Sequence, residues 1–154
     1  LDLLRHFGAR VSASPAGITV SPGPLTAVEA DMRSIPDALP VLSVLAAQSR
    51  GESRFLRAGR LRLKESDRLA AVEGLLRSLG GCARAGEDSL TVEGRPLTGG
   101  QTDGCGDHRI VMAAAIAACA CREPVFIRGA QAVEKSYPTF FQDYSALGGH
   151  VHVI

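Results

Sequence analysis

The chain has 154 residues, of which 45% are hydrophobic and 21% are charged. This profile predicts one soluble globular unit with a sizeable core rather than a disordered chain. The formal charge of +1 argues against broad electrostatic binding of nucleic acid. The longest apolar run, 110–121, is too short to span a bilayer, and no N-terminal segment has the pattern of a signal peptide. We therefore expect a cytoplasmic protein that does not bind a membrane.

The four cysteines include no Cys-x-x-Cys pair, and a chain that can build an apolar core has little need of a disulfide framework. We predict that all four are free thiols and that most are buried. Cys105 and His108 have a spacing that metal ligands can use, but no second pair completes a site. The sequence therefore predicts no metal centre.

In the first half of the chain, helical and extended patterns alternate. Residues 1–7 resemble the end of a helix, as if the chain began in the middle of a fold, and 9–12 and 17–21 predict a β-hairpin. The apolar spacing after residue 38 predicts a helix that begins near Asp37, because a proline is tolerated only before a helix or in its first turn. A strand is predicted at 53–58.

The second half shows the same alternation. The predicted elements are a helix between Lys64 and Gly80, strands at 82–85 and 89–93, a glycine-rich loop at 97–106, a helix from Asp107 or His108, a strand at 124–128, a helix at 136–147 and a strand at 150–154.

Three features recur at nearly one spacing, which predicts an internal repeat. The matched pairs, separated by 70 to 72 residues, are 17–20 with 89–92, Asp37 with Asp107, and Lys64 with Lys135. The repeated unit is a helix end, a β pair, a helix, a strand and a helix. We predict that 1–154 is a single partial domain with repeats at about 1–72 and 73–143 and the start of a third unit at 144–154.

Each predicted unit has an aspartate at the start of its first helix and a lysine at the start of its second. Helix starts are natural anion sites, because their backbone N–H groups are free and the helix dipole is positive there. For each residue alone a simpler interpretation exists, an N-cap for Asp107 and a solvated surface lysine for Lys64 or Lys135. The N-cap is the preferred interpretation of Asp107.

Charged residues are concentrated in one copy of the repeat. Residues 64–68 contain Lys64, Glu65 and Arg68, and Arg109 follows Asp107. Together with Lys135 these cations could bind a small, multiply charged anion, since arginine suits bidentate contact with carboxylate or phosphate. Glu65, beside such cations, is a candidate acid or base.

Four motifs resemble the C-terminal half of the 5-enolpyruvylshikimate-3-phosphate synthase (3-phosphoshikimate 1-carboxyvinyltransferase) family, and the likeness extends from about Leu1 to the C-terminus. In chain order they are SIPDA, KESDRLAAVEGLLRSLGG, GDHRIVMAAAIA and VEKSYPTFF. The resemblance implies an α/β (α+β) fold of tandem βαβαββ units, the inside-out barrel of enolpyruvyl transferases, with about two of the three units of one domain present here.

The implied reaction belongs to the shikimate pathway of aromatic amino acid biosynthesis. It transfers the enolpyruvyl group of phosphoenolpyruvate to the 5-hydroxyl of shikimate 3-phosphate and releases phosphate, without a metal or organic cofactor. The resemblance also implies that an N-terminal domain of the same enzyme, which holds most of the shikimate-binding residues, is missing here. We therefore expect the isolated chain to be inactive, and its uncovered apolar faces to favour self-association.

The resemblance implies a role for eight residues of the motifs. Asp37 corresponds to the base for the 5-hydroxyl, Lys64 to a group between both substrates, Glu65 to the proton carrier at the methylene, Arg68 and Arg109 to the pair that binds phosphoenolpyruvate, Lys135 to the lysine on its opposite side, and Asp107 and His108 to supporting residues at the helix start.

Two other functions remain open at this point. One is the sister transfer of enolpyruvyl to UDP-N-acetylglucosamine, which the Lys-Glu-Ser-Asp-Arg and Lys-Ser-Tyr-Pro segments disfavour. The other is a non-catalytic anion-binding or structural module, which would keep the fold and lose the reaction. The filled charged positions argue against the second.

Overall fold

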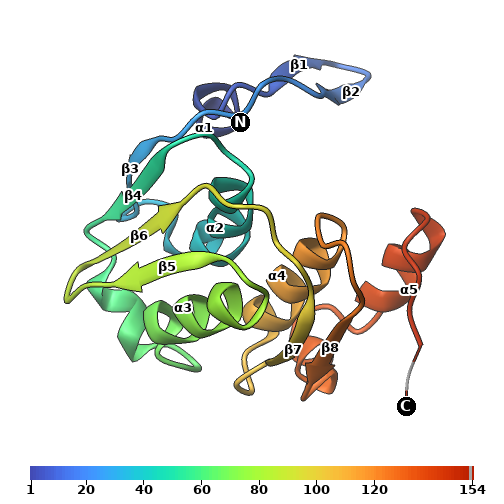
Figure 1. The fold of residues 1–154 in the computed structure, drawn as a ribbon. Coiled ribbons are helices and arrows are strands. Elements are labelled where there is room, and N and C mark those ends of the chain that lie inside the picture. The colour runs from blue at the N-terminus through green and yellow to red at the C-terminus, as the bar shows by residue number, and fades with distance from the viewer. Residues whose placement is uncertain (153) are drawn as a thin grey trace.

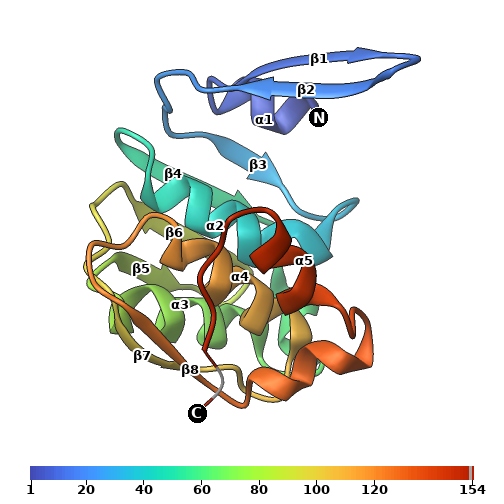
Figure 2. The same ribbon diagram turned by 90° about the vertical axis from the view of Figure 1, so that its right-hand side faces the viewer.

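The computed structural model describes residues 1–152 and 154, and Figures 1 and 2 show its fold. The first half contains α1 (Asp2–His6), β1 (Arg10–Ser14), β2 (Gly17–Ser21), β3 (Glu29–Asp31), the 3-10 helix η1 (Pro36–Ala38), α2 (Leu39–Ala47), β4 (Glu52–Leu56) and the 3-10 helix η2 (Gly59–Leu63). The second half contains α3 (Arg68–Ser78), β5 (Cys82–Ala85), β6 (Ser89–Glu93), β7 (Gly100–Asp103), α4 (His108–Ala118), β8 (Val125–Arg128), the 3-10 helix η3 (Ala130–Lys135) and α5 (Phe140–Ala146).

Three helices, α2, α3 and α4, contact one another in the interior and carry strands on the outside (Figure 1). The largest sheet has the order β3-β4-β6-β5, in which β3 and β4 are parallel and the other pairs antiparallel. A second sheet is the parallel pair β7-β8, and the third is the hairpin β1-β2. This arrangement of helices inside and strands outside is the one expected for the inside-out barrel.

The core is apolar because each interior helix buries a stripe of aliphatic side chains against its neighbours. Alanines let α4 approach the other helices closely, since their side chains are short. The core includes Leu39, Leu42, Phe55, Leu69, Val72, Leu76, Leu90, Val92, Ile110, Ala113 and Ala117.

Both parallel strand pairs have the same register relative to the chain. Glu29 pairs with Arg54 in β3-β4, and Gly100 pairs with Val125 in β7-β8. Each residue of the second pair lies 71 residues after its counterpart in the first. The structure therefore repeats with the spacing that the sequence features have.

The hairpin β1-β2 differs from its counterpart β5-β6 in what covers it. Leu90 and Val92 of β6 are fully buried, whereas Ile18 and Val20, 72 residues earlier, are 60% and 56% exposed. Figures 1 and 2 show the hairpin beside α1 and away from α2, α3 and α4. One apolar face of the hairpin is therefore uncovered.

Several element predictions were wrong in detail. The strand β3 was not predicted, and β7 lies in the segment that was predicted to be a glycine-rich loop. Both strands are short and are held by pairing with a distant parallel strand, which a local pattern does not show. Residues 150–152 and 154 form no strand, and Val153, the other residue of that predicted strand, lies outside the described residues.

The cysteine prediction was half right. All four are free, but Cys105 and Cys119 are exposed and Cys82 and Cys121 only partly buried. Cys105 has a positive φ of 53° in the turn before α4, which places its side chain at the surface. Within residues 1–152 and 154, no helix is long and apolar enough to cross a membrane.

Candidate active site

The N-terminal ends of three helices meet at one point, and Arg68 joins them. Arg68 is the first residue of α3, Asp107 is the N-cap of α4, and Asp37 lies in η1 just before α2. The guanidinium donates from Nε to Asp107 Oδ2 at 2.7 Å, from Nη2 to Asp107 Oδ1 at 3.2 Å and from Nη1 to Asp37 Oδ1 at 2.8 Å. The three helix starts therefore converge on one guanidinium.

The carboxylate of Asp107 is fully buried and fully hydrogen-bonded. Besides the bonds from Arg68, it accepts hydrogen bonds from the backbone N–H of Arg109 at 2.9 Å and from the Ser66 hydroxyl at 3.1 Å. The bond from Arg109 makes Asp107 the N-cap of α4. Burial raises the pKa of Asp107, but these hydrogen bonds and the charge of Arg68 lower it more, so the net shift is downward. The carboxylate therefore stays ionised in the interior.

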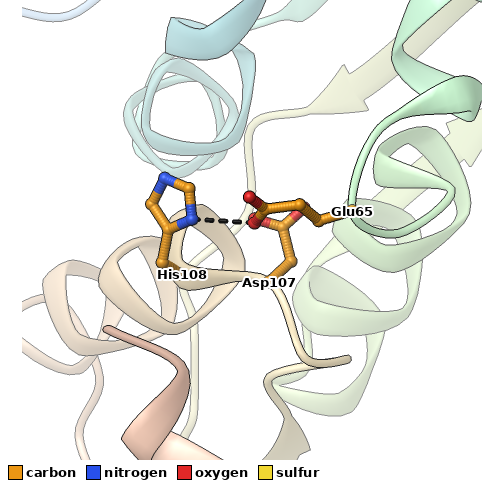
Figure 3. Close-up of side chains that lie close together, drawn as sticks. All are labelled: Glu65, Asp107 and His108. Atoms are coloured by element: carbon orange, nitrogen blue, oxygen red, sulfur yellow. Dashed lines mark hydrogen bonds and ion pairs between the residues drawn. The ribbon is translucent and has the colours of Figure 1, made fainter. Parts of the chain in front are cut away.

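Glu65 lies on the loop between η2 and α3 and contacts a histidine and a lysine. His108 Nδ1 is 2.7 Å from Oε2, and Lys135 Nζ is 2.7 Å from Oε1. Figure 3 shows His108 and Glu65 facing each other across the start of α4, beside Asp107. The hydrogen bond from Lys135 lowers the pKa of Glu65, burial opposes this, and His108 lowers it further, so the net pKa is below its usual value.

Asp37 faces three cations and is partly exposed. Lys64 Nζ lies 3.4 Å from Oδ1, and Arg109 Nη2 lies 3.6 Å from Oδ2, in addition to the contact with Arg68. Burial raises the pKa of Asp37, but Arg109, Lys64 and Arg68 lower it more, and the net shift is downward. Asp37 is therefore an ionised acceptor that a ligand can reach.

All eight predicted residues belong to this one network of ion pairs and hydrogen bonds, but the expectation that each lysine starts a helix was wrong. Lys64 and Lys135 do not start helices: Lys64 follows η2, and Lys135 ends η3. Arg68 and Arg109 are also unequal, because the side chain of Arg68 is only 3% exposed and is bound by carboxylates, whereas that of Arg109 is 37% exposed.

Two residues of this region were not predicted. Ser66, within the Lys-Glu-Ser-Asp-Arg segment, donates to Asp107. Arg62 contacts Asp67, the N-cap of α3. Their place beside a charged motif was the only available signal, because both contacts depend on the local path of the backbone.

A metal ion is not favoured by the donor set. Glu65, Asp107 and His108 could each offer one ligand atom within 4.8 Å of the others. However, Arg68 already lies on the Asp107 carboxylate, and both oxygens of Glu65 bind Lys135 and His108. A divalent cation would have to displace these groups, so the cluster suits an anionic ligand better.

A separate groove lies beside this network. It has a volume of about 670 Å³ and runs along α3 between Ser66 and Ser78, with Gln101 and Arg128 on its other wall. It shares only Ser66 with the charged network. The groove therefore does not coincide with the charged network.

Comparisons with known proteins give matches over nearly the whole chain. The family model of EPSP synthase (3-phosphoshikimate 1-carboxyvinyltransferase) matches residues 1–144. The chain is 41% identical to the 3-phosphoshikimate 1-carboxyvinyltransferase of Clostridium kluyveri over 152 residues, which are 98% of this chain and 36% of that protein. It is 43% identical to the protein of the same name from Aeropyrum pernix over 155 residues, a match that covers 100% of this chain and 36% of that protein.

Solved structures show the same fold. An EPSP synthase from Acinetobacter baumannii has a TM-score of 0.86 and 26% identity, and the match covers 98% of this chain and 39% of that one. The enolpyruvyl transferase NikO from Streptomyces tendae has a TM-score of 0.81 and 24% identity, and the match covers 98% of this chain and 35% of that one. At that identity the second match concerns the fold alone. The chain spans little more than a third of the length of the curated relatives described above.

Proposed function

Because this chain belongs to the EPSP synthase (3-phosphoshikimate 1-carboxyvinyltransferase) family, we propose that it supplies the phosphoenolpyruvate side of that enzyme's active site. The whole enzyme would transfer the enolpyruvyl group to the 5-hydroxyl of shikimate 3-phosphate and release phosphate. The observation that carries this proposal is the convergence of Lys64, Arg68, Arg109 and Lys135 on the carboxylates of Asp37 and Glu65.

The cations divide into outer and inner groups. Lys135, with a side chain 62% exposed, and the partly exposed Lys64 and Arg109 can turn to an incoming anion. Phosphoenolpyruvate offers a carboxylate and a phosphate, which arginine and lysine bind well. Arg68 would contact the ligand with the N–H groups that Asp107 and Asp37 leave free, while it keeps the helix starts together.

Proton transfer is assigned to the two acids that lie among the cations. Asp37, ionised and reachable, would accept the proton of the 5-hydroxyl as its oxygen attacks C2 of phosphoenolpyruvate. Glu65 would carry the proton that the methylene carbon gains and then loses as phosphate leaves. When Lys135 turns to the substrate, Glu65 loses the largest influence that lowers its pKa, so its pKa rises and it can hold a proton.

The cations also lower the barrier itself. A tetrahedral intermediate and a departing phosphate both carry negative charge that fixed cations stabilise. Loss of one such group should raise the barrier by about 2–4 kcal/mol. Asp107 and His108 would act by fixing Arg68 and Glu65, since each makes a direct contact with one of them.

The partners follow from the family. They are phosphoenolpyruvate, shikimate 3-phosphate and an N-terminal domain of the same enzyme, without which we expect no turnover; the cytoplasm is the expected compartment. The division into repeats at about 1–72 and 73–143, with a third unit from 144, is supported by the equal registers of the two parallel strand pairs. The exposed face of β1-β2 supports self-association of the isolated chain.

Calorimetry of phosphoenolpyruvate with the 154-residue chain tests the proposal. We expect the wild type to bind and Arg109→Ala to bind at least tenfold more weakly, since about 1.4 kcal/mol corresponds to a factor of ten. Arg77→Ala removes an exposed arginine of α3 that pairs with Glu73 and serves as the matched control. Equal binding by wild type and Arg109→Ala would contradict the proposal.

The same experiment can be extended to the competing functions. In the full-length enzyme, shikimate 3-phosphate should be consumed and UDP-N-acetylglucosamine should not. Tight binding of phosphoenolpyruvate without any turnover in that enzyme would indicate the non-catalytic module instead. Phosphate release by the 154-residue chain alone would contradict the expected inactivity.

A further inference from the structure

A short loop carries two of the site residues, and an ion pair closes it. The loop joins η2 to α3 and contains Lys64, Glu65 and Ser66. Arg62 lies before these residues and Asp67 after them, and Arg62 Nη1 donates to Asp67 Oδ2 at 2.5 Å. The loop is thus tied at both ends by one contact between residues five positions apart.

Arg62 also attaches this loop to the β5-β6 turn. Its Nε donates to the carbonyl oxygen of Glu87 at 3.1 Å, and its Nη2 donates to that of Gly86 at 2.6 Å. The same turn binds the other end of η2, where Asp88 Oδ1 accepts the N–H of Gly59. The guanidinium therefore links three segments with three nitrogens, a geometry that lysine cannot reproduce because it presents a single charged nitrogen.

The second partner of the ion pair has a further role. Asp67 is the N-cap of α3 and accepts the N–H of Ala70 at 3.1 Å. The residue after it, Arg68, joins the helix starts at the site. Arg62 thus acts on the loop and on the start of α3 at once, while its own polar contacts are with Asp67 and the β5-β6 turn and not with the charged network.

We propose that Arg62 is a positioning residue, which fixes the loop so that Lys64 faces Asp37 and Glu65 faces His108 and Lys135. The predicted loss of ligand affinity rests on the proposed function. Side chains that are held in place for a ligand bind it more weakly when their support loosens. Loss of Arg62 would leave Glu65 free to move away from Lys135 and His108.

The test uses Arg62→Ala and Arg62→Lys in the 154-residue chain. We expect both to weaken phosphoenolpyruvate binding roughly tenfold, with little recovery from the retained charge of lysine. Carbon-13 NMR titration of the Glu65 carboxyl should show its pKa moving up towards the usual value, because the contact with Lys135 that lowers it most is loosened. Unfolding in urea gives the fraction folded for each variant.

Arg60→Ala is the matched control, since Arg60 is an exposed arginine of the same 3-10 helix and its loss changes the net charge equally. It should leave both the affinity and the Glu65 titration unchanged. If Arg62→Ala fails to fold, the affinity and the Glu65 titration of Arg62→Lys test the positioning role. If the pKa of Glu65 in the folded Arg62 variants equals that in the wild type, the positioning role is wrong. Absence of binding by the wild type instead overturns the proposed function, and the titration still decides the role of Arg62.

Discussion

The contact between Arg68 and Asp107 is the interaction on which the charged network depends, and Arg68→Met tests it. The two side chains are 3% and 0% exposed. Methionine keeps most of the length of the side chain and removes the guanidinium, so the main change is the loss of a cation beside a buried carboxylate. The site would then contain an ionised Asp107 without its strongest partner.

The expected loss of stability can be worked out from these contacts. Removing one partner of a buried ion pair costs about 3–5 kcal/mol. Asp107 retains the N–H of Arg109 and the hydroxyl of Ser66, so we expect the lower end, about 3 kcal/mol. The contact with the half-exposed Asp37 adds less than about 1 kcal/mol, because solvent screens it.

Urea unfolding of the 154-residue chain, followed by circular dichroism at pH 7, measures this change. With a urea m-value of roughly 2 kcal/mol/M, the midpoint should fall by about 1.5 M. Arg77→Met removes the exposed ion pair with Glu73 on the same helix, where the arginine side chain is 67% exposed, and should change stability by only about 0.3–0.5 kcal/mol.

The pH dependence gives an independent check. The folded pKa of Asp107 is lowered below its unfolded value, so its contribution to stability is present above the unfolded pKa and is lost as the pH falls through the folded pKa. In Arg68→Met, burial without the cation raises the pKa of Asp107. The difference in stability between wild type and variant should therefore shrink as the pH is lowered from 7.

A double variant separates the buried charge from other effects of the substitution. Asp107→Asn removes the charge and keeps an oxygen that can cap α4, so in the Arg68→Met background it should restore most of the lost stability. The reasoning is refuted if Arg68→Met costs no more than Arg77→Met, or if adding Asp107→Asn gives no recovery.

Three further predictions concern other parts of the chain. Lys135→Ala should raise the pKa of Glu65, since Lys135 is the largest influence that lowers it, and an unchanged carboxyl titration by NMR would contradict this. Val20→Asp should reduce self-association measured by light scattering, because it places a charge on the uncovered face of β1-β2; an unchanged mass distribution would exclude that face. Gly74→Ala should stabilise α3 by about 0.4–1 kcal/mol, since the added Cβ meets nothing within 4 Å. Gly104→Ala should cost about 1–3 kcal/mol, because the added Cβ would clash with a methyl group of Val111. A urea midpoint equal to that of the wild type would contradict either prediction.

Patterns along the chain predicted the interior helices and two hairpins well, because each depends on a run of its own residues. The apolar stripe of α3 and the buried Leu90 and Val92 belong to elements whose period is visible locally. The strands β3 and β7 were missed because their ladders join segments about 25 residues apart. A polar stretch such as 100–103 becomes a strand only when a partner lies beside it.

The candidate site likewise combines features that the sequence predicted with features that only the fold decided. The repeat spacing and the four motifs named all eight charged residues before any geometry was known, because side-chain chemistry is a property of sequence. The opposite environments of Arg68 and Arg109 came only from the fold. Both are arginines near helix starts, yet one is enclosed by carboxylates and the other reaches solvent.

By itself, the sequence indicated which groups could bind an anion and predicted an internal repeat. The tertiary structure decided which carboxylate each cation faces, that Asp107 is buried, and that Arg62 pairs with Asp67 across the loop bearing Lys64 and Glu65. The physical reason is that hydrogen bonds depend on distances of about 3 Å between residues up to 72 positions apart. Such distances are set by how helices and strands pack, and no local pattern contains them.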